Sequence, residues 1–438
     1  MLQNRFVTEA SEVKKDTEYS KQTLLSMNIL FLADYFLPHA GGSRVYYYNL
    51  YSRLVKDFPD KLTILTKKVP GWKQFDSQFS RDAFRIIRHS KPLPNLRAQH
   101  LPKIALPLVR TLDQVSRQRV DILHPGDLYP QGVIARWIKE LFGIPYIAYC
   151  HGEDITQSDR YRYQPMVRNW IYEGADAIVA ACEFARENLL RIGIENQRIV
   201  KITPGVDYER FSPKLPKREI VSQYGLAGRK VLLTVARLFP RKGHEAVIRA
   251  VANLASKFPD LAYLVVGTGP EQDRLQKIVG EVGLKEAIKF VGYVSEDSLA
   301  DFYNVCDIFV MPNDEDANGD IEGFGMVFLE ANSAGKPVIA GRSGGTADSV
   351  IDGVTGYRVN PKDVNEITAA LSRLLGNPEL RVRIGEAGLR RAREEFDWRT
   401  RAEALRQLSF EIAERTWQRE TGLTAPRLPF GFGRLFRG

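Results

Sequence analysis

The stretch Val231-Leu-Leu-Thr-Val-Ala236, continued by Arg237-Leu-Phe-Pro-Arg-Lys242-Gly243, predicts a buried strand, a loop and the start of a helix. A short unbroken aliphatic run is typical of a strand that is covered on both faces of a parallel sheet. The helix that follows carries apolar residues at helical spacing, namely Val247, Ala250, Val251 and Leu254. One strand–helix unit of an α/β domain is therefore expected here.

The same alternation of strand and helix runs through the rest of the chain. Before this stretch, Asn28–Ala33 predicts a first strand, and the helix after it carries Tyr47, Leu50, Tyr51 and Leu54 on one face. Further strands are expected at 62–66, 122–124, 146–149, 177–180, 199–202, 262–266, 289–291, 307–311 and 337–340. A helix with Leu299, Phe302 and Tyr303 places Cys306 in the core. This pattern predicts an α/β protein of two Rossmann-like domains that face a central cleft, with ligands at the carboxyl ends of the strands.

Breaks in the pattern give the expected domain boundaries. A flexible extension at 1–26 precedes an N-terminal domain at 27–210, and a Pro-rich linker covers 211–228. A C-terminal domain follows at 229–390. The last parts are a helix at 391–420 that crosses back to the N-terminal domain and a basic, aromatic tail at 421–438.

Composition excludes several classes of protein. The 438 residues include 62 Lys and Arg against 53 Asp and Glu, a net charge of +9, with ordinary globular hydrophobicity. Cys150, Cys182 and Cys306 are far apart and have no metal-ligand spacing, which argues against zinc and disulfide frameworks and for a reducing compartment. No apolar run is long enough to span a bilayer, and the first residues lack the apolar core of a signal peptide. We expect a cytoplasmic location, or a peripheral one at the inner face of the membrane.

The excess positive charge is localised. Arg81 to Arg119 holds nine Lys and Arg against two acids, and the tail adds Arg427, Arg434 and Arg437 among phenylalanines and leucines. Basic residues interleaved with apolar ones suit an anionic membrane surface, although a solvated basic face has the same composition. No nucleic-acid-binding motif is present, so we expect no nucleic-acid partner.

Two loops at expected strand ends suit a phosphate group. Arg237 and Lys242 place two cations five residues apart directly after a strand, where they would neutralise a diphosphate. Gly41-Gly42 stands between the first strand and its helix, where glycine lets the backbone approach a phosphate beside free helix amides. The Gly-Gly pair lacks the spacing of a dinucleotide-binding loop.

Two further loops carry groups that suit sugars. Glu322 and Glu330 lie eight residues apart, about 12 Å along one helix, which exceeds the separation of paired glycosidase carboxylates and suits two hydroxyl-bearing parts of one ligand. His151 follows the strand at 146–149 and can donate to a sugar hydroxyl or a leaving phosphate.

A metal ion is not expected. Asp314-Glu-Asp316 matches an Asp-x-Asp pattern, but it lies in an acidic loop, and Arg237 and Lys242 already serve a diphosphate. No cofactor is predicted either.

Together these motifs resemble the family-four retaining glycosyltransferases of GT-B fold. They are Gly41-Gly42, His151, Arg237 with Lys242, and Glu322-x7-Glu330, followed by Ala334-Gly-Lys-Pro-Val-Ile-Ala340 and Ser343-Gly-Gly. Within that family the chain is most similar to bacterial phosphatidylinositol mannosyltransferases, from Met27 to about Arg415.

The resemblance implies roles for individual residues. Arg237 and Lys242 would neutralise the leaving nucleoside diphosphate, and Glu330 would bind the ribose hydroxyls. Glu322 and the amides of Gly323, Phe324 and Gly325 would hold the donor sugar, with His151 beside it. The remaining donor contacts would be Gly41 and Gly42 at the diphosphate and the backbone around Gly267 and Val294 at the base.

The resemblance also implies a metal-independent transfer of a hexose, mannose first, to a lipid-linked or polysaccharide acceptor. GDP-mannose is the expected donor, with a UDP-sugar next. Two alternatives stay open: a sugar-nucleotide epimerase of the same fold, and a transferase that uses a UDP-sugar with a soluble acceptor. A sugar- or lipid-binding module without turnover is a third, since intact site residues do not prove catalysis.

Overall fold

The computed structural model describes residues 26–39, 41–79, 83–90, 101–160 and 163–421. The predicted extension and most of the predicted tail lie outside these residues. Contacts divide the chain into two units, each formed by separate segments. Unit 1 contains residues 1–149, 169–179 and 402–438, and unit 2 contains 150–168 and 180–401. The predicted boundaries at 210 and 229 remain predictions, because these contacts group 180–210 with unit 2.

Unit 1 is built on a four-stranded parallel sheet of order β3-β2-β1-β4. The strands are β1 (Asn28–Leu32), β2 (Lys61–Lys67), β3 (Phe84–His89) and β4 (Ile122–Pro125), and the helices between them are α2 (Gly42–Asp57), α3 (Trp72–Phe79) and α4 (Leu101–Arg117). Leu30 is fully buried and aligns with Thr63 on one side and Leu123 on the other, as expected for a central strand. The predicted apolar face of α2 is buried.

A bridge between Leu123 and Tyr146 leads from β4 toward a second, three-stranded sheet of order β5-β6-β7. Its strands are β5 (Ile147–Cys150), β6 (Ala177–Ala180) and β7 (Ile199–Lys201), and the helices of this part are η1 (Leu128–Gly132), α5 (Val133–Phe142), α6 (Glu153–Ser158), α7 (Gln164–Gly174), α8 (Glu183–Arg191) and η2 (Asn196–Arg198). All six strands expected before residue 203 are thus confirmed.

Unit 2 contains a six-stranded parallel sheet of order β10-β9-β8-β11-β12-β13. Its strands are β8 (Lys230–Val235), β9 (Leu261–Val266), β10 (Ile288–Gly292), β11 (Ile308–Met311), β12 (Val338–Gly341) and β13 (Gly356–Val359). Its helices are α9 (Arg218–Gln223), η3 (Pro240–Lys242), α10 (His244–Leu254), α11 (Gln272–Glu281), α12 (Glu296–Val305), α13 (Met326–Ser333), α14 (Thr346–Ser349), α15 (Val364–Gly376) and α16 (Pro378–Glu395). The predicted faces of α10 and α12 are buried, and so is Cys306.

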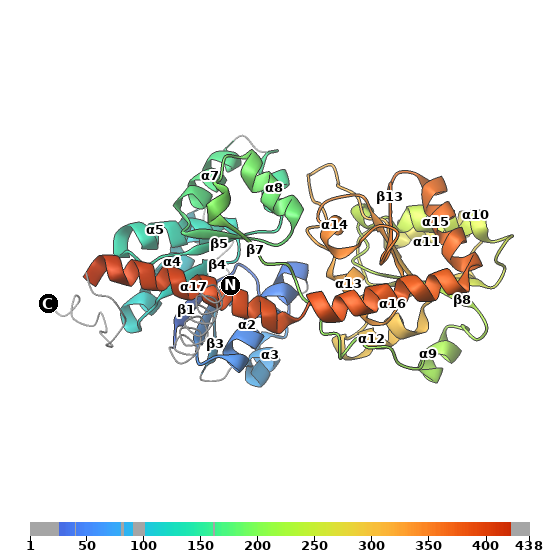
Figure 1. The fold of residues 1–438 in the computed structure, drawn as a ribbon, viewed down its shortest axis with the longest axis horizontal. Helices are drawn as coiled ribbons and strands as arrows, with labels where there is room; N and C mark the ends of the chain where they lie inside the picture. Colours follow the sequence, from blue (N-terminus) through green and yellow to red (C-terminus); the bar gives the residue numbers. More distant parts are fainter. Residues whose placement is uncertain (1–25, 40, 80–82, 91–100, 161–162, 422–438) are drawn as a thin grey trace, which may run out of the picture. The chain divides into compact units, whose positions relative to one another are not determined.

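The parallel sheets and their strand orders confirm the predicted pair of Rossmann-like domains (Figure 1). The segment predicted as linker differs from expectation, since it holds α9 with Ile220 buried. No helix within the described ranges is both long enough and apolar enough to cross a membrane.

The predicted crossover helix at 391–420 is wrong in one respect: it is not continuous. Helix α16 ends at Glu395 and α17 (Trp398–Thr421) begins two residues later (Figure 1). The break has a physical cause, because the Phe396 carbonyl accepts a hydrogen bond from the Val206 amide at 2.8 Å. Asp397 then accepts the Arg399 amide at 2.9 Å, in the manner of a helix N-cap.

Helix α17 packs within unit 1, as the predicted return to the N-terminal domain requires. Arg406 donates from Nε to Asp60 Oδ2 at 2.6 Å, and both side chains are buried. One turn further, Ser409 Oγ lies 3.3 Å from His124 Nε2. The C-terminal helix is therefore fixed to the β1–β4 sheet by buried polar contacts.

Candidate active site

Three loops at the carboxyl edge of the unit 2 sheet are joined by backbone hydrogen bonds. The Leu238 amide donates to the Thr268 carbonyl at 3.0 Å, and the Gly267 amide donates to the Gly292 carbonyl at 2.8 Å. Gly267 has φ +132°, and a Cβ there would lie 2.0 Å from the Ala236 carbonyl oxygen, so only glycine fits. The loops that carry Arg237, Gly267 and Val294 are therefore neighbours along one edge.

Arg237 leaves the end of β8 with an exposed side chain. Its guanidinium lies 4.9 Å from the centre of the Phe239 ring and, among the described residues, forms no ion pair. An uncommitted guanidinium at a strand end is available to an anionic ligand.

Arg241 and Lys242 lie in the turn η3, directly before α10. Gly243 follows with φ +74°, and a Cβ there would lie 2.3 Å from the Pro312 carbonyl oxygen. This close approach brings the turn against the chain after β11, where Lys242 pairs with Glu322. Arg241 contacts Asp320 at 2.7 Å and Glu322 at 3.2 Å.

Glu322 is thus held by two cations at once. Burial alone would raise its pKa, but the charges of Lys242 and Arg241 hold the pKa below its ordinary value, so the carboxylate is ionised. The expectation that Glu322 and Glu330 share one helix is wrong, because Glu322 lies in the loop and α13 begins only at Met326. The left-handed Gly325, φ +83°, ends the loop and delays the helix.

The glycine loop before α13 presents free backbone donors. Within the described part of the chain, the amides of Gly323, Phe324 and Gly325 donate no hydrogen bond. The Phe324 ring turns inward and lies 5.9 Å from that of Phe396, so only its backbone is available to a ligand. Such amides at a helix start suit an oxygen-rich or anionic ligand.

His151 lies beside the same loop. A Cβ at Gly323 would come within 2.6 Å of the His151 carbonyl oxygen, so the two backbones are in contact. Burial lowers the pKa of His151 against the raising effect of Asp154, which keeps the imidazole neutral at physiological pH. The His151 amide donates to the Asp154 carboxylate at 2.6 Å, which fixes the turn.

Glu330 lies on α13 and has a different partner from Glu322. It accepts a hydrogen bond from the Tyr303 hydroxyl at 2.5 Å and has no cation paired to it among the described residues. Burial raises the pKa of Glu330 to about 7, and the Tyr303 hydrogen bond opposes that rise. A carboxylate without a counter-ion has lone pairs to spare for ligand hydroxyl groups.

Gly41 and Gly42 belong to unit 1, where they connect the chain after β1 to α2. Gly41 is the N-cap of α2 and, having no side chain, supplies no side-chain cap to that helix. Their predicted contact with a diphosphate remains a prediction.

The acidic loop after β11 directs its side chains to different partners. Asp314 lies 3.5 Å from Lys362, Glu315 pairs with Arg160 at 2.7 Å, and Asp316 accepts the amides of Asn318 and Asp320. These carboxylates do not converge on one point.

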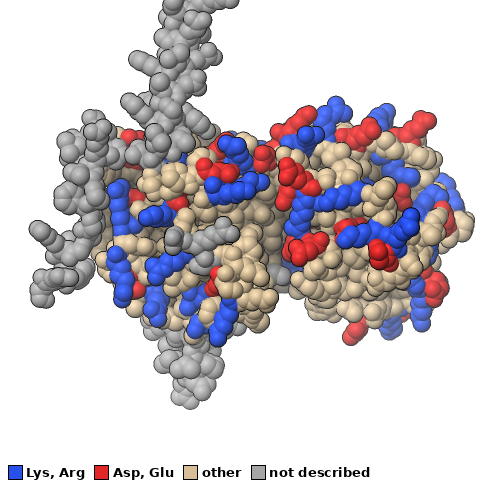
Figure 2. All heavy atoms as spheres, turned by 90° about the horizontal axis from the view of Figure 1, so that it is seen from below, with Lys and Arg blue, Asp and Glu red and all other residues tan. Residues whose placement is uncertain are grey.

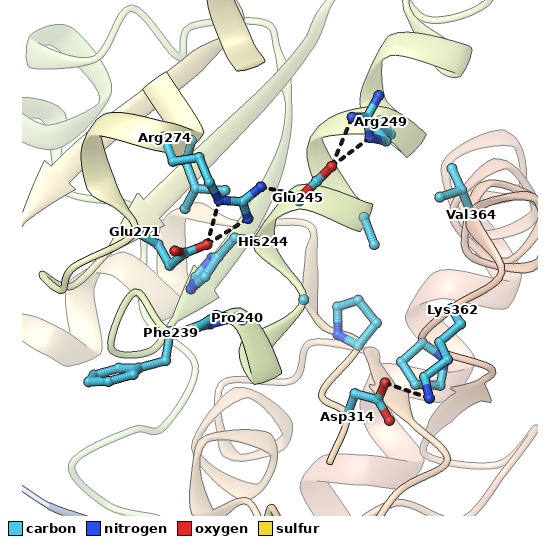
Figure 3. Close-up of a pocket in the computed structure, with 15 residues that line it drawn as sticks. Phe239, Pro240, His244, Glu245, Arg249, Glu271, Arg274, Asp314, Lys362 and Val364 are labelled. Atoms are coloured by element: carbon cyan, nitrogen blue, oxygen red, sulfur yellow. Dashed lines mark hydrogen bonds and ion pairs between the residues drawn. The ribbon is translucent and has the colours of Figure 1, made fainter. Parts of the chain in front are cut away.

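A pocket of about 300 Å³ is lined by residues of η3, α10 and α11 and by the segments after β11 and β13 (Figure 3). Its cations are committed to acids, since Arg274 pairs with Glu271 and Glu245, and Lys362 pairs with Asp314. Neither Glu322 nor Glu330 lines it. It is therefore separate from the candidate site.

Sequence reasoning missed four residues that the structure brings into this site: Arg241, Asp320, Glu153 and Tyr303. Arg241 precedes Lys242 in the loop Arg237–Gly243, Asp320 stands two residues before Glu322, and Glu153 stands two residues after His151. All three are therefore close neighbours of residues that the sequence selected. For Tyr303 the sequence gave only its position on the apolar face of a helix, which does not indicate a role in the site.

Two family models match the chain. The model described as Glycosyltransferase Family 4 matches residues 40–210, and the model described as Glycosyl transferases group 1 matches residues 216–391. Together they cover every residue of the candidate site and every strand except β1.

Curated relatives match over nearly the full length. A GDP-mannose-dependent alpha-(1-6)-phosphatidylinositol monomannoside mannosyltransferase of Mycolicibacterium smegmatis is 30% identical over 382 residues, 87% of this chain and 97% of the relative. A D-inositol 3-phosphate glycosyltransferase 2 of Catenulispora acidiphila is 29% identical over 83% of this chain and 88% of the relative.

Solved structures share the fold. HepE of Anabaena, determined with UDP and glucose, gives a TM-score of 0.74 at 20% identity and covers 88% of this chain and 100% of that one. Sucrose-phosphate synthase of Thermosynechococcus elongatus gives 0.73 at 23% identity, with 88% and 99% covered. Both likenesses agree with the predicted GT-B architecture.

Proposed function

We propose that this chain, which belongs to the family-four glycosyltransferases and takes a nucleotide-sugar donor, transfers mannose from GDP-mannose to a lipid-linked acceptor. The similarity to a GDP-mannose-dependent enzyme over 97% of that relative's length carries the proposal. Membership of this family sets aside the epimerase alternative.

Within unit 2, the proposed donor site is the surface formed by Arg237, Lys242, Glu322 and the amides of 323–325. The ribose hydroxyls would bind at Glu330, whose carboxylate has no counter-ion, and His151 would orient the sugar. In the structure Lys242 is occupied by Glu322. We infer that the diphosphate takes over the ammonium group, which frees Glu322 to accept hydrogen bonds from the sugar.

The reaction breaks the bond from the anomeric carbon to the phosphate oxygen and forms one to the acceptor oxygen. Negative charge grows on the departing diphosphate, where Arg237, Lys242 and free amides would stabilise it. We propose retention of configuration by front-face attack, in which the departing phosphate oxygen takes the acceptor's hydroxyl proton. Because two fixed cations face the diphosphate, we expect no requirement for a metal ion.

A thermal-shift panel with GDP, UDP and ADP, each with and without EDTA, tests the donor. A ligand at a hundred times its Kd that binds only the folded state stabilises it by about 2.7 kcal/mol. We expect GDP to raise the Tm most, and equally in EDTA. A shift with UDP alone would move the donor to a UDP-sugar, and no shift with any nucleotide would contradict the proposed site.

We base the proposal of a lipid-linked acceptor on the charged surface of unit 1. Figure 2 shows Lys and Arg grouped over this unit on the face seen from below. The exposed cations between the start of β2 and the end of α4 include Lys61, Lys68, Lys73, Arg85, Arg110 and Arg117. Val109, on α4, is 59% exposed. Exposed cations together with an exposed apolar side chain suit an anionic lipid headgroup layer.

Co-sedimentation with liposomes of anionic and of neutral lipid tests this surface. We expect the intact chain to pellet with anionic liposomes at low salt and to be released as salt rises. Truncation after Gln418, which removes Arg427, Arg434 and Arg437, should weaken the binding. Equal recovery with neutral and anionic liposomes would contradict a lipid-linked acceptor, whereas the nucleotide shifts would be unaffected.

A further inference from the structure

The loop that carries the free amides of 323–325 is in contact with the glycines before α14. Helix α14 lies beside α13, the helix that follows the loop (Figure 1). The Gly345 amide donates to the Glu322 carbonyl at 2.9 Å. A Cβ at Gly344 would overlap the Glu322 carbonyl oxygen, and a Cβ at Gly345 would overlap the Gly323 carbonyl oxygen. This close approach of two backbones therefore requires glycine at both positions.

A buried hydroxyl adds a second hydrogen bond to the same loop. Ser349, the last residue of α14, is fully buried, and its Oγ donates to the Phe324 carbonyl at 2.7 Å. The carbonyl of Thr346, in the same helix, lies further away, at 3.3 Å. Since a serine hydroxyl has one proton to donate, it serves the nearer carbonyl of Phe324.

These two hydrogen bonds determine where the amides of the loop point. In a planar trans peptide the C=O and N–H bonds point in opposite directions. The Phe324 carbonyl points toward Ser349, so the Gly325 amide points away from it. By the same argument the Gly323 amide points away from Gly345. Neither amide donates a hydrogen bond to another described residue, so both are available to a ligand.

The peptide between Phe324 and Gly325 can adopt two orientations. Gly325 has φ +83° and, without a Cβ, also tolerates negative φ, so its own residue does not prevent this peptide from turning over. The buried Phe324 ring lies 5.9 Å from that of Phe396, which fixes the residue but not the direction of its carbonyl. The hydroxyl of Ser349 therefore selects the orientation.

The end of α14 that carries this hydroxyl is itself fixed. Arg391 of α16 donates to the carbonyls of Asp348 and Ser349, at 2.7 and 3.1 Å. The Asp348 carboxylate accepts the Glu183 amide of α8 at 2.7 Å and lies 3.2 Å from Lys201 of β7. Contacts with three other elements of unit 2 thus hold Ser349 in place.

We propose that Ser349 is a positioning residue of the donor site, which holds the Phe324–Gly325 peptide so that the Gly325 amide points toward the donor sugar and the departing phosphate. The inference rests on the proposed function, since it assumes that the amides of 323–325 bind the donor. Without the hydroxyl, the Phe324 carbonyl loses its partner and the peptide turns over in part of the molecules. The Gly325 donor is then lost from the site in that fraction.

The variant Ser349→Ala tests the proposal, since it removes the hydroxyl and adds no atom to the core. The probes are GDP-mannose and GMP, because GMP keeps the base and the ribose but lacks the second phosphate and the sugar. We expect the Kd of GDP-mannose to rise about fivefold to tenfold and the Kd of GMP to stay within about twofold of wild type. The kcat for GDP release should fall by about tenfold or more. UDP-glucose and UMP are the corresponding pair if UDP is the nucleotide that raises the Tm.

Two further variants separate positioning from stability. Ser349→Cys keeps a weaker donor at the same place and should give a Kd for GDP-mannose between those of wild type and Ser349→Ala. Ser409→Ala is the matched control, because it removes a buried hydroxyl in unit 1 that donates to the Leu405 carbonyl at 2.7 Å. This control should lower the Tm, as Ser349→Ala does, and leave both Kd values unchanged.

The outcomes distinguish the two proposals. A Kd of GDP-mannose that stays at the wild-type value in Ser349→Ala, or a Kd of GMP that rises equally, would overturn the role of Ser349 and leave the donor site standing. If wild type binds neither GDP-mannose nor UDP-glucose, the proposed function is overturned, and the role of Ser349 with it.

Discussion

Replacing Lys242 by alanine should lower the turnover of the nucleotide sugar by about a hundredfold or more while the fold stays intact. The lysine is 12% exposed and contacts Glu322, beside the open amides of 323–325. A preorganised cation at the departing diphosphate stabilises the charge that develops in the transition state. Its loss should therefore lower mainly kcat. The fold should survive because Glu322 keeps Arg241 at 3.2 Å.

The measurement is the rate of nucleoside diphosphate release, with the Tm recorded for each variant. Lys277→Ala is the matched control, because this lysine of α11 is 80% exposed and lies 4.0 Å from its nearest acid. We expect the control to retain wild-type turnover. Near-normal turnover in Lys242→Ala, or an equal loss in both variants, would refute the role assigned to Lys242.

The fold was largely predictable because most of its strands are short runs of aliphatic residues. The sequence analysis missed two strands, β3 and β13, which contain charged residues: β3 contains Arg85 and Arg88, and β13 contains Arg358. Arg88 is satisfied by Asp76 on α3, at 2.8 Å, a contact that no local pattern contains. When the charged residues of a strand form ion pairs with a neighbouring helix, the sequence pattern of that strand resembles that of a charged loop.

The break between α16 and α17 was hidden for a related reason. The sequence from 378 to 418 keeps helical composition throughout, whereas the break at Phe396 includes a long-range hydrogen bond from the Val206 amide to the Phe396 carbonyl. Tertiary contacts of this kind override local propensity.

The candidate site was predictable as a set of loops but not as a set of pairs. The strand-end rule selected the loops of Arg237, Lys242 and Glu322, and in the structure these loops follow β8 and β11. It could not show that Lys242 and Glu322, 80 residues apart, contact each other. Nor could it show that Arg241 is buried between Asp320 and Glu322, because these acids follow in the sequence only 79 and 81 residues later.

Replacing Arg406 by alanine should lower the free energy of unfolding by about 3–5 kcal/mol at neutral pH. Asp60 is fully buried and has two partners in unit 1, Arg406 at 2.6 Å and the Met27 amide at 2.9 Å. Without the arginine, the carboxylate would be left in the interior with only the amide. The guanidinium also lies 4.9 Å from the centre of the Phe58 ring, so packing is lost as well.

The pH dependence of this loss identifies its cause. Burial already raises the pKa of Asp60, and Arg406 opposes that rise, so removing Arg406 raises the pKa further. A carboxyl whose pKa is higher in the folded state binds more protons there, and its destabilising effect grows as pH rises. The difference between Arg406→Ala and wild type should therefore narrow as the pH falls from about 7 to about 5.

Urea unfolding followed by circular dichroism measures both effects. Arg415→Ala, an exposed arginine of the same helix, is the matched control and should stay within about 0.5 kcal/mol of wild type. A loss in Arg406→Ala that does not change with pH would assign the effect to packing on Phe58 instead of to the charge of Asp60. Stability equal to wild type would mean that α17 is held to unit 1 by its apolar contacts alone.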